Sequence, residues 1–386
     1  MDGWTTKGVG NDSRRMQLLA TTRARHHRPR PLAAWLALIA LAALGSGRAA
    51  LAFDWQVEVA PAAELFPVLD LSQSPRAADS GNGLVSVRLH GADLPRQLRL
   101  RIDTPGLREP ATIEVARGDR DTLELRPRLD WDVGALRELR QPRRQILRIM
   151  LDGDGLAPRM REVPVRLHPL DEAPYFVRDG VDRVDLGWVF AAYVNPHDAA
   201  VDSVLELARR IEPAFDDAAT PRLRRVGAVW AALEQHGLRY ANGDPALSRG
   251  PVLWSQHVRL PEDGWNERRA NCIDGSVLIA SVLERLRIPV SIVLVPGHAF
   301  VAFHADAGLR GIRYLETTVL GAQGHDGSRF MAALAAGQAR WQAAAAHFRH
   351  RHGPDHALID IDRARAYGII PLAVDGHPVD PRARSP

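Results

Sequence analysis

The period of the hydrophobic residues changes near residue 170, and this change constrains the fold more than any other feature of the chain. Before it, apolar and polar residues alternate in six short segments that Pro and Gly separate: 84–91, 97–103, 111–117, 122–129, 145–153 and 161–169. Evenly spaced strands with this period of two are typical of an antiparallel β-sandwich. We therefore predict a β-sandwich domain over residues 53–170, which serves as a binding or spacer module.

A helical period follows the stretch 168–180, which we interpret as the junction. Residues 198–212 and 221–237 repeat apolar positions at three and four, as amphipathic helices do. Gly237 is suited to end the second helix. Further segments of this half are a polar loop, a third strand, an Ala-rich helix and a closing segment, at 239–251, 311–321, 329–350 and 360–374. Helices and strands mixed in this way predict an α+β domain.

The first 52 residues have the three zones of a secretory signal peptide. A basic region, Arg23 to Arg30, precedes an apolar run, Leu32 to Leu44, and then the A-x-A-like sequence of residues 50–52. The apolar run is shorter than the about 20 residues that span a bilayer. We expect cleavage before Phe53 and a periplasmic or secreted protein. An uncleaved anchor is the alternative, and only then would the chain bind a membrane; either Met1 or Met16 is the true start.

Charge and cysteine content exclude several classes of protein. Residues 1–52 carry a net charge of +6 and the whole chain +4, so the remaining 334 residues carry −2. A body so close to neutral gives no electrostatic basis for nucleic-acid binding. Cys272 is the single cysteine among 386 residues, which excludes an internal disulfide framework and a cysteine-rich zinc site.

Cys272 lies where a helix is expected to begin. Asn271 is a suitable N-cap residue, Asp274 stands where a capping-box partner belongs, and residues 276–286 continue at helical spacing. The unpaired N–H groups and the helix dipole at such an N-terminus favour a thiolate. A buried, unreactive thiol is the alternative, because a free cysteine usually behaves as a small hydrophobic residue.

Two strands after this helix carry a histidine and a carboxylate. Residues 290–295 are expected to form a buried strand, Pro296-Gly297 a turn, and 298–304 a second strand that begins with His298. If 298–304 and 311–317 pair as antiparallel strands, Glu316 returns to the end of the sheet where His298 lies. Cys272, His298 and Glu316 then supply a nucleophile, a base and the acceptor that orients the base.

These blocks resemble the transglutaminase-like superfamily, a branch of the papain-like cysteine fold. The matching stretches are "NCIDGSVLIASVLE", "VPGHAFVAF" and "YLETT". The resemblance covers roughly residues 175–375, leaving 376–386 as a tail, and implies a papain-like core behind an Ig-like sandwich. It also implies that Cys272, His298 and Glu316 are catalytic and that no cofactor is needed. Glu316 departs from the Asp that the superfamily usually has, yet it can still accept from an imidazole.

The same resemblance suggests auxiliary residues. Papain-like enzymes often place a glutamine upstream of the cysteine as an oxyanion donor, and Gln256 is the candidate here, unless it is a solvated loop residue. Trp254 and Trp265 are weaker candidates for lining a substrate cleft, with packing in the core as the alternative. Residues 256–265 and 360–372 resemble one bacterial branch of the superfamily.

A histidine cluster near the C-terminus offers a competing site. Histidines at this density can bind zinc, but no H-E-x-x-H pattern accompanies them, and cationic side chains are common at a helix end. We therefore expect no metal site there. The cluster consists of His347, His350, His352 and His356.

Three functions remain compatible with the sequence. The first is an exported cysteine amide hydrolase that forms a thioester with a protein or peptide substrate, for which the cell envelope is one source. The second is a transglutaminase, in which an amine takes the acyl group. The third is a catalytically inert binding protein. We favour hydrolysis, because no feature of the sequence excludes water from the site.

Overall fold

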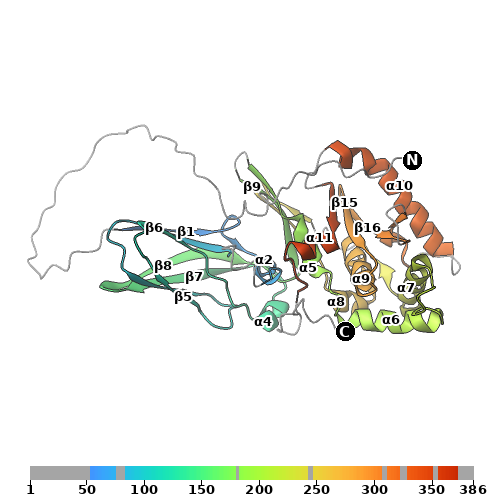
Figure 1. Cartoon of the computed structure of the whole chain (residues 1–386), viewed down its shortest axis with the longest axis horizontal. Coiled ribbons are helices and arrows are strands. Elements are labelled where there is room, and N and C mark those ends of the chain that lie inside the picture. Colours follow the sequence, from blue (N-terminus) through green and yellow to red (C-terminus); the bar gives the residue numbers. More distant parts are fainter. Residues whose placement is uncertain are drawn as a thin grey trace, which may run out of the picture.

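The computed structural model describes residues 53–74, 83–179, 182–241, 247–306, 311–321, 328–350 and 355–372. Its described part mixes helices and strands, as an α+β fold does. Figure 1 shows an elongated molecule in which strands dominate one end and helices surround sheets at the other. The predicted signal peptide and the tail 376–386 lie outside the described residues. None of the helices in the described ranges is both long and apolar enough to span a bilayer.

The first half of the chain forms two sheets. One has the strand order β1-β3-β6 and the other the order β2-β8-β7-β4-β5, and all neighbours are antiparallel except β2 and β8. Each of the six segments predicted from the alternating pattern overlaps one strand, from β3 to β8, and β7 and β8 begin before their segments. The strands are β1 (Asp54–Val59), β2 (Glu64–Leu65), β3 (Val85–His90), β4 (Gln97–Asp103), β5 (Ala111–Ala116), β6 (Thr122–Leu125), β7 (Arg143–Gly153) and β8 (Leu156–Leu167).

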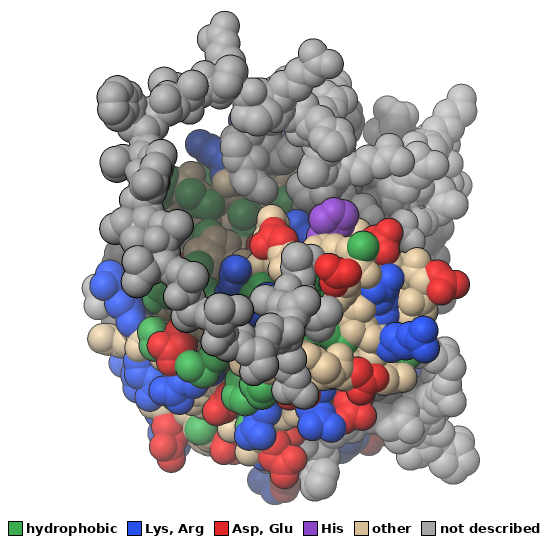
Figure 2. All heavy atoms as spheres, turned by 90° about the vertical axis from the view of Figure 1, so that its left-hand side faces the viewer, with side chains coloured by type: hydrophobic (Ala, Val, Ile, Leu, Met, Phe, Trp, Pro, Cys, Tyr) green, Lys and Arg blue, Asp and Glu red, His purple; other side chains and the backbone are tan. Residues whose placement is uncertain are grey.

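Alternation along β4 illustrates how the pattern directs side chains. Leu98, Leu100 and Ile102 are buried, whereas Arg99 and Arg101 between them are exposed. The exposed face is not uniformly basic, because Arg99 forms an ion pair with Glu114 of β5. Figure 2 likewise shows basic and acidic side chains interspersed on one end of the molecule. This half therefore presents a mixed polar surface around an apolar interior.

Two short helices, α2 (Pro67–Leu71) and α4 (Val133–Glu138), accompany these sheets. Asp70 of α2 is almost completely buried and accepts a hydrogen bond of 2.9 Å from the indole N–H of Trp131. Burial raises the pKa of Asp70 to about 7, although the hydrogen bond from Trp131 acts in the opposite direction. The core of this half thus contains a titrating carboxyl group.

In the second half of the chain, the described residues form two antiparallel four-stranded sheets and one parallel pair of strands. Their strand orders are β10-β9-β13-β12, β17-β16-β15-β18 and β11-β14. The bounds are β9 (Glu172–Asp179), β10 (Asp182–Asp185), β11 (Arg239–Tyr240), β12 (Leu247–Arg249), β13 (Leu253–His257), β14 (Arg269–Ala270), β15 (Val290–Val295), β16 (His298–His304), β17 (Ile312–Leu315) and β18 (Ala357–Asp360).

Helices surround these sheets, and α9 lies at their centre against β15 and β16 (Figure 1). Nearly every residue of α9 is buried, including the polar residues Asp274, Ser276 and Ser281. Asp198 caps α6, and Gly237 ends α7 in the left-handed conformation, as expected. The helices are α5 (Phe190–Tyr193), α6 (Ala199–Ile211), α7 (Arg222–His236), α8 (Pro261–Glu267), α9 (Cys272–Arg285), α10 (Ser328–His350) and α11 (Ile361–Ala366).

Three segments differ from the sequence prediction. The junction expected at 168–180 contains β9, whose pairing with β13 makes it part of the second half. The polar loop expected at 239–251 contains β11 and β12. The strand expected at 311–321 ends at Leu315, because the Glu316 carboxylate then accepts from the Thr318 N–H and starts a short 3-10 helix at Thr317–Val319.

The two halves are joined by more than the chain that links them. Gln73 forms a bridge with Ile369, and the Ile370 N–H donates to the Ser72 carbonyl at 2.8 Å. The segment after α11 therefore returns to the first half. At the same junction, the buried His168 contacts Glu64 with one ring nitrogen and Glu172 with the other.

Candidate active site

A capping box holds the N-terminus of α9 and places Cys272 in its first turn. The Asn271 side-chain oxygen accepts from the Ile273 and Asp274 N–H groups at 3.0 Å each, and the Asp274 carboxylate accepts from the Asn271 N–H at 3.2 Å. The cap expected from the sequence is thus confirmed. Cys272 itself is half-buried. The first N–H groups of a helix lack an intrahelical acceptor, so they are available to donate to an anion that approaches this end of α9.

Asp274 also connects this helix to the segment that follows β13. Its buried carboxylate accepts from the Arg259 backbone N–H and from the Arg259 guanidinium, both at 2.9 Å. Arg259 follows Gln256 by three residues. The buried ion pair therefore holds the strand that carries Gln256 next to the turn that carries Cys272.

His298 and Glu316 meet at one end of the sheet with the strand order β17-β16-β15-β18. The turn at Pro296-Gly297 reverses the chain, so Val295 of β15 pairs with His298 of β16, and Gly297 has a φ of +71°. Strands β16 and β17 are antiparallel, which returns the chain to the same end just before Glu316. His298 Nε2 lies 2.8 Å from Glu316 Oε2. The antiparallel pairing expected from the sequence is present.

The protonation states of this pair follow from their contacts. Burial disfavours the charged form of His298, but its hydrogen bonds to Cys272 and Glu316, and the charges of both, raise its pKa to about 9. Burial likewise disfavours the Glu316 carboxylate, but hydrogen bonds from His298 and Thr318 and the imidazolium charge lower its pKa to about 2. At neutral pH the pair is an imidazolium and a carboxylate.

The hydrogen bond between His298 and Cys272 brings the third residue into the arrangement. Because Nε2 faces Glu316, Nδ1 is the ring nitrogen that remains for the thiol. The structure therefore brings together Cys272, His298 and Glu316, in the order in which a nucleophile, its base and the orienting acceptor are arranged in a triad.

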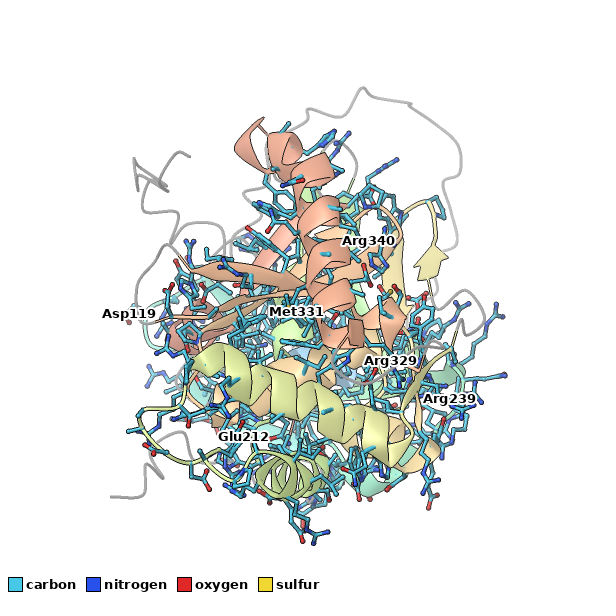
Figure 3. The ribbon with its side chains drawn as sticks, turned by 90° about the vertical axis from the view of Figure 1, so that its right-hand side faces the viewer. Asp119, Glu212, Arg239, Arg329, Met331 and Arg340 are labelled. Atoms are coloured by element: carbon cyan, nitrogen blue, oxygen red, sulfur yellow. The ribbon has the colours of Figure 1, made fainter. Side chains whose placement is uncertain are left out.

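Arg340 is a neighbour of this group that sequence patterns do not indicate. It lies on α10 (Figure 3), and its Nε contacts the same Oε2 atom of Glu316 that faces His298. The Arg340 side chain is 48% exposed, whereas that of Glu316 is 1% exposed. The Arg340 guanidinium therefore competes with the His298 imidazolium for the negative charge of Glu316. No local sequence pattern indicates Arg340. It is one of several arginines on α10 and follows Glu316 by 24 residues.

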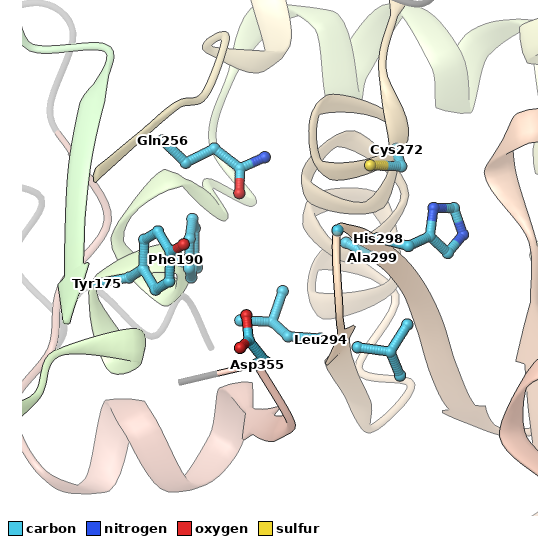
Figure 4. A pocket seen from close by; sticks show the side chains of 10 residues that line it. Tyr175, Phe190, Gln256, Cys272, Leu294, His298, Ala299 and Asp355 are labelled. Carbon is cyan, nitrogen blue, oxygen red and sulfur yellow. The ribbon is translucent and has the colours of Figure 1, made fainter. Parts of the chain in front are cut away.

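A narrow pocket opens beside the cysteine (Figure 4). Its volume is about 30 Å³, which accommodates one or two water molecules. Figure 4 shows the Gln256 side chain extending toward Cys272 from the opposite wall. The residues that line the pocket are Tyr175, Phe190, Gln256, Cys272, Leu294, Val295, Gly297, His298, Ala299 and Asp355.

The two tryptophans suggested for a cleft lie elsewhere. Trp265 is buried and stacks on the His236 ring at a centroid distance of 3.5 Å, so it belongs to the core. Trp254 packs against Phe176 at 5.0 Å and donates from its indole N–H to the Gly250 carbonyl at 3.2 Å. Neither side chain lines the pocket. A regular strand would turn Trp254 and Gln256 to the same face, because they are two positions apart, but the register of β13 shifts between Trp254 and Ser255.

The aromatic wall is supplied instead by Tyr175 of β9 and Phe190 of α5. Asp355, in the segment before β18, also lines the pocket. Sequence analysis missed these three residues, because they lie 97, 82 and 83 positions from Cys272 and share no motif with it. The pairing of β9 with β13 brings Tyr175 to the pocket, and the pairing of β18 with β15 brings the segment that contains Asp355.

The C-terminal histidines form no recognisable metal site in the described ranges. His347 and His356 stack with a ring-centroid distance of 4.6 Å. The side chains of His350 and His352 lie outside the described residues. Among the residues that the structure describes, no group of three or more His, Cys, Asp or Glu side chains is arranged to hold a metal ion.

Comparison with known proteins identifies a distant likeness among solved structures. No family model matches the sequence, and no curated protein matches it. Among solved structures, the chain is similar to the crystal structure of red sea bream transglutaminase, with 11% sequence identity and a TM-score of 0.19. The match covers 62% of this chain and 48% of that one, so the chain spans about half the length of the protein it matches. A likeness at this level carries no weight for function, and the geometry of the site has to decide.

Proposed function

We propose that this protein is a cysteine-dependent amide hydrolase in which Cys272, His298 and Glu316 form the catalytic triad. The observation that carries the proposal is the position of His298, which is hydrogen-bonded to Cys272 and lies 2.8 Å from the buried Glu316 carboxylate. A buried carboxylate that fixes the imidazole beside a thiol at a helix N-terminus is what nucleophilic catalysis requires.

The first half of the reaction forms a thioester. The Cys272 thiolate attacks the carbonyl carbon of the amide, and the carbonyl oxygen becomes an oxyanion. In this proposal the Cys272 backbone N–H and the side-chain amide of Gln256, both from residues that line the pocket, donate to it. His298 gives its proton to the amine nitrogen, the C–N bond breaks, and the amine leaves.

The second half consumes water. His298, now neutral, takes a proton from a water molecule whose oxygen attacks the thioester carbon. The C–S bond then breaks, the carboxylic acid leaves, and the thiolate–imidazolium pair is restored. Hydrolysis is favoured over transfer to an amine because the pocket beside Cys272 accommodates water. Transglutaminase-type transfer is the second candidate, and it differs only in the acceptor.

The domain division proposed from the sequence accompanies this function. In it, residues 53–170 are an Ig-like β-sandwich, residues 175–375 a papain-like, transglutaminase-like domain, and residues 1–52 a signal peptide for export. Support comes from the two sheets of the first half and from the helix-to-sheet packing of α9 on β15 and β16. Protein or peptide substrates outside the cytoplasm fit this arrangement.

The decisive experiment measures the alkylation rate of Cys272 against pH. It needs no substrate, and a single cysteine makes the signal unambiguous. We expect the rate to stay high down to about pH 6 and to fall markedly in His298→Ala, because the imidazolium stabilises the thiolate. His304→Ala, at the other end of β16, is the matched control and should leave the profile unchanged.

A rate that titrates near the free-cysteine value of about 8.5 and ignores His298→Ala would instead make the protein an inert binding module. Incubation with an activated ester supplies the positive evidence. Intact-mass measurement should then show an acyl group on the wild type and none on Cys272→Ser.

A further inference from the structure

We propose that Gly275 and Thr317 are positioning residues of the proposed triad. The side chain of Thr317 rests on the bare backbone of Gly275, and this contact sets the distance between the Cys272 thiol and the imidazole of the triad. The inference rests on the proposed function, because it concerns the same site. It adds two residues to which sequence analysis assigned no role.

Thr317 connects the two sides of the triad. It follows Glu316 directly, its side chain is buried, and its hydroxyl donates to the Cys272 carbonyl oxygen at 3.3 Å. The Glu316 carboxylate, one residue earlier, lies 2.8 Å from the His298 ring. Two successive residues therefore contact the histidine on one side and the backbone of the cysteine on the other. A movement of this pair relative to α9 changes the position of the imidazole relative to the thiol.

Gly275, near the N-terminus of α9, leaves the space in which Thr317 lies. A Cβ atom at Gly275 would lie 3.0 Å from the Cβ atom of Thr317 and 3.3 Å from its Oγ1 atom. Ordinary contacts between carbon atoms lie at about 3.5–4.0 Å. One added methyl group therefore requires that α9 and the segment after Glu316 move apart.

The segment 316–320 is also held from outside α9. The Glu316 N–H donates to the Ala333 carbonyl of α10 at 3.1 Å, and the Tyr240 N–H of β11 donates to the Leu320 carbonyl at 2.9 Å. Because Thr317 is buried between these elements, its side chain has no path into solvent. A displaced Thr317 therefore carries Glu316 with it, and the imidazole that contacts Glu316 moves as well.

The test is Gly275→Ala, measured by NMR titration of the His298 ring and by the alkylation rate of Cys272 at pH 6. Burial opposes the charge on His298, but Cys272 and Glu316 raise its pKa to about 9. Separation of these groups should lower the pKa of His298 by about one unit. Alkylation should slow about tenfold, because a rise of one unit in the thiol pKa reduces the thiolate fraction by that factor.

Gly264→Ala is the matched control. Gly264 is likewise a buried glycine in a helix, α8, but a Cβ atom there would lie 3.5 Å from the Arg269 carbonyl oxygen, which is an ordinary contact. Both measurements should keep their wild-type values in this variant. Circular dichroism checks folding, and alanine forms helices more readily than glycine, so loss of helix is not expected in either variant.

Two further variants separate the contact from other effects. Thr317→Gly, added to Gly275→Ala, removes the opposing Cβ atom and should recover most of the lost alkylation rate. Ser276→Ala removes the other hydroxyl that donates to the Cys272 carbonyl, at 2.7 Å, and leaves the contact intact, so the pKa of His298 should not change. An unchanged pKa in Gly275→Ala, no recovery in the double variant, or an equal fall in Ser276→Ala would each overturn the positioning role.

The two proposals fail in distinguishable ways. The hydrolase proposal fails if the wild type takes no acyl group from an activated ester, and the pKa of His298 still reports on Gly275→Ala in that case. The positioning role fails if the wild type is acylated and Gly275→Ala is acylated at the same rate with the same His298 pKa.

Discussion

Arg340 and His298 share one oxygen atom of Glu316. The Nε atom of Arg340 contacts Oε2, and His298 Nε2 lies 2.8 Å from the same Oε2. Two cations therefore contact the carboxylate that orients the imidazole. The Arg340 guanidinium is half-exposed on α10, and the His298 imidazolium lines the pocket. This arrangement limits how strongly Glu316 stabilises the imidazolium.

Replacing Arg340 by Gln should raise the pKa of His298 above its present value of about 9. Without the guanidinium, the full carboxylate charge acts on the imidazolium, which then holds its proton more strongly. Because Arg340 is half-exposed and screened by solvent, we expect a rise of about half a pH unit. NMR titration of the His298 ring measures it. Arg340→Lys should keep the original value, as should Arg329→Gln at the start of the same helix; a fall in the pKa would contradict the shared-oxygen interpretation.

Glu316→Gln should impair the chemistry more than the fold. The amide keeps the size of the carboxylate but carries no charge, so the pKa of His298 should fall toward its ordinary value of 6.5. Loss of an orienting carboxylate in a triad lowers kcat by about 10²- to 10⁴-fold. Acyl-enzyme formation from an activated ester checks this, with circular dichroism as the control for folding. An unchanged acylation rate would remove Glu316 from the triad.

Asp274→Ala should destabilise the protein much more than Glu267→Ala, although both carboxylates contact Arg259. The Asp274 side chain is 2% exposed and that of Glu267 is 51% exposed. Removing one partner of a buried ion pair costs about 3 kcal/mol, whereas exposed pairs contribute about 0–1 kcal/mol. Urea denaturation gives both free energies of unfolding. Similar losses in the two variants would show that the cap of α9 depends little on the buried pair.

Asp70→Asn should stabilise the protein at pH 8 and not at pH 4. The pKa of Asp70 is about 7 in the folded state and 3.8 ordinarily, so the unfolded chain releases this proton first as the pH rises. Stability is therefore complete below about pH 4 and is lost progressively up to about pH 7. The variant avoids this loss and keeps an oxygen that accepts from Trp131, so it should gain about 2–4 kcal/mol at pH 8.

The free energy of unfolding measured from pH 4 to pH 8 checks the Asp70 prediction. Asp130→Asn is the control, because that carboxylate is exposed. A constant difference between Asp70→Asn and the wild type over this range would show that Asp70 is not the titrating group.

Local sequence predicted the elements well where one physical rule dominates. Alternation located β3 to β8, because alternate residues are the less exposed ones along strands such as β4, β5 and β6. Asn271 and Asp274 located the start of α9, because a capping box is formed by neighbours in the chain. The spacing of His298 and Glu316 was informative because a hairpin brings the two residues to one end. Trp254 and Trp265 do not line the pocket beside Cys272, and the sequence does not say which face of an element meets a cavity.

The sequence by itself indicated the residues that we propose for the chemistry: a thiol at a helix start, a histidine after a turn and a glutamate at the next strand end. Tertiary structure alone decided their surroundings. It placed Arg340 on the Glu316 carboxylate and brought Tyr175, Phe190 and Asp355 to the same pocket as Cys272. The physical reason is how far apart in the chain the interacting residues lie. Caps and hairpins depend on residues close in the chain, whereas a pocket wall depends on which distant strands pair and which helix packs over them.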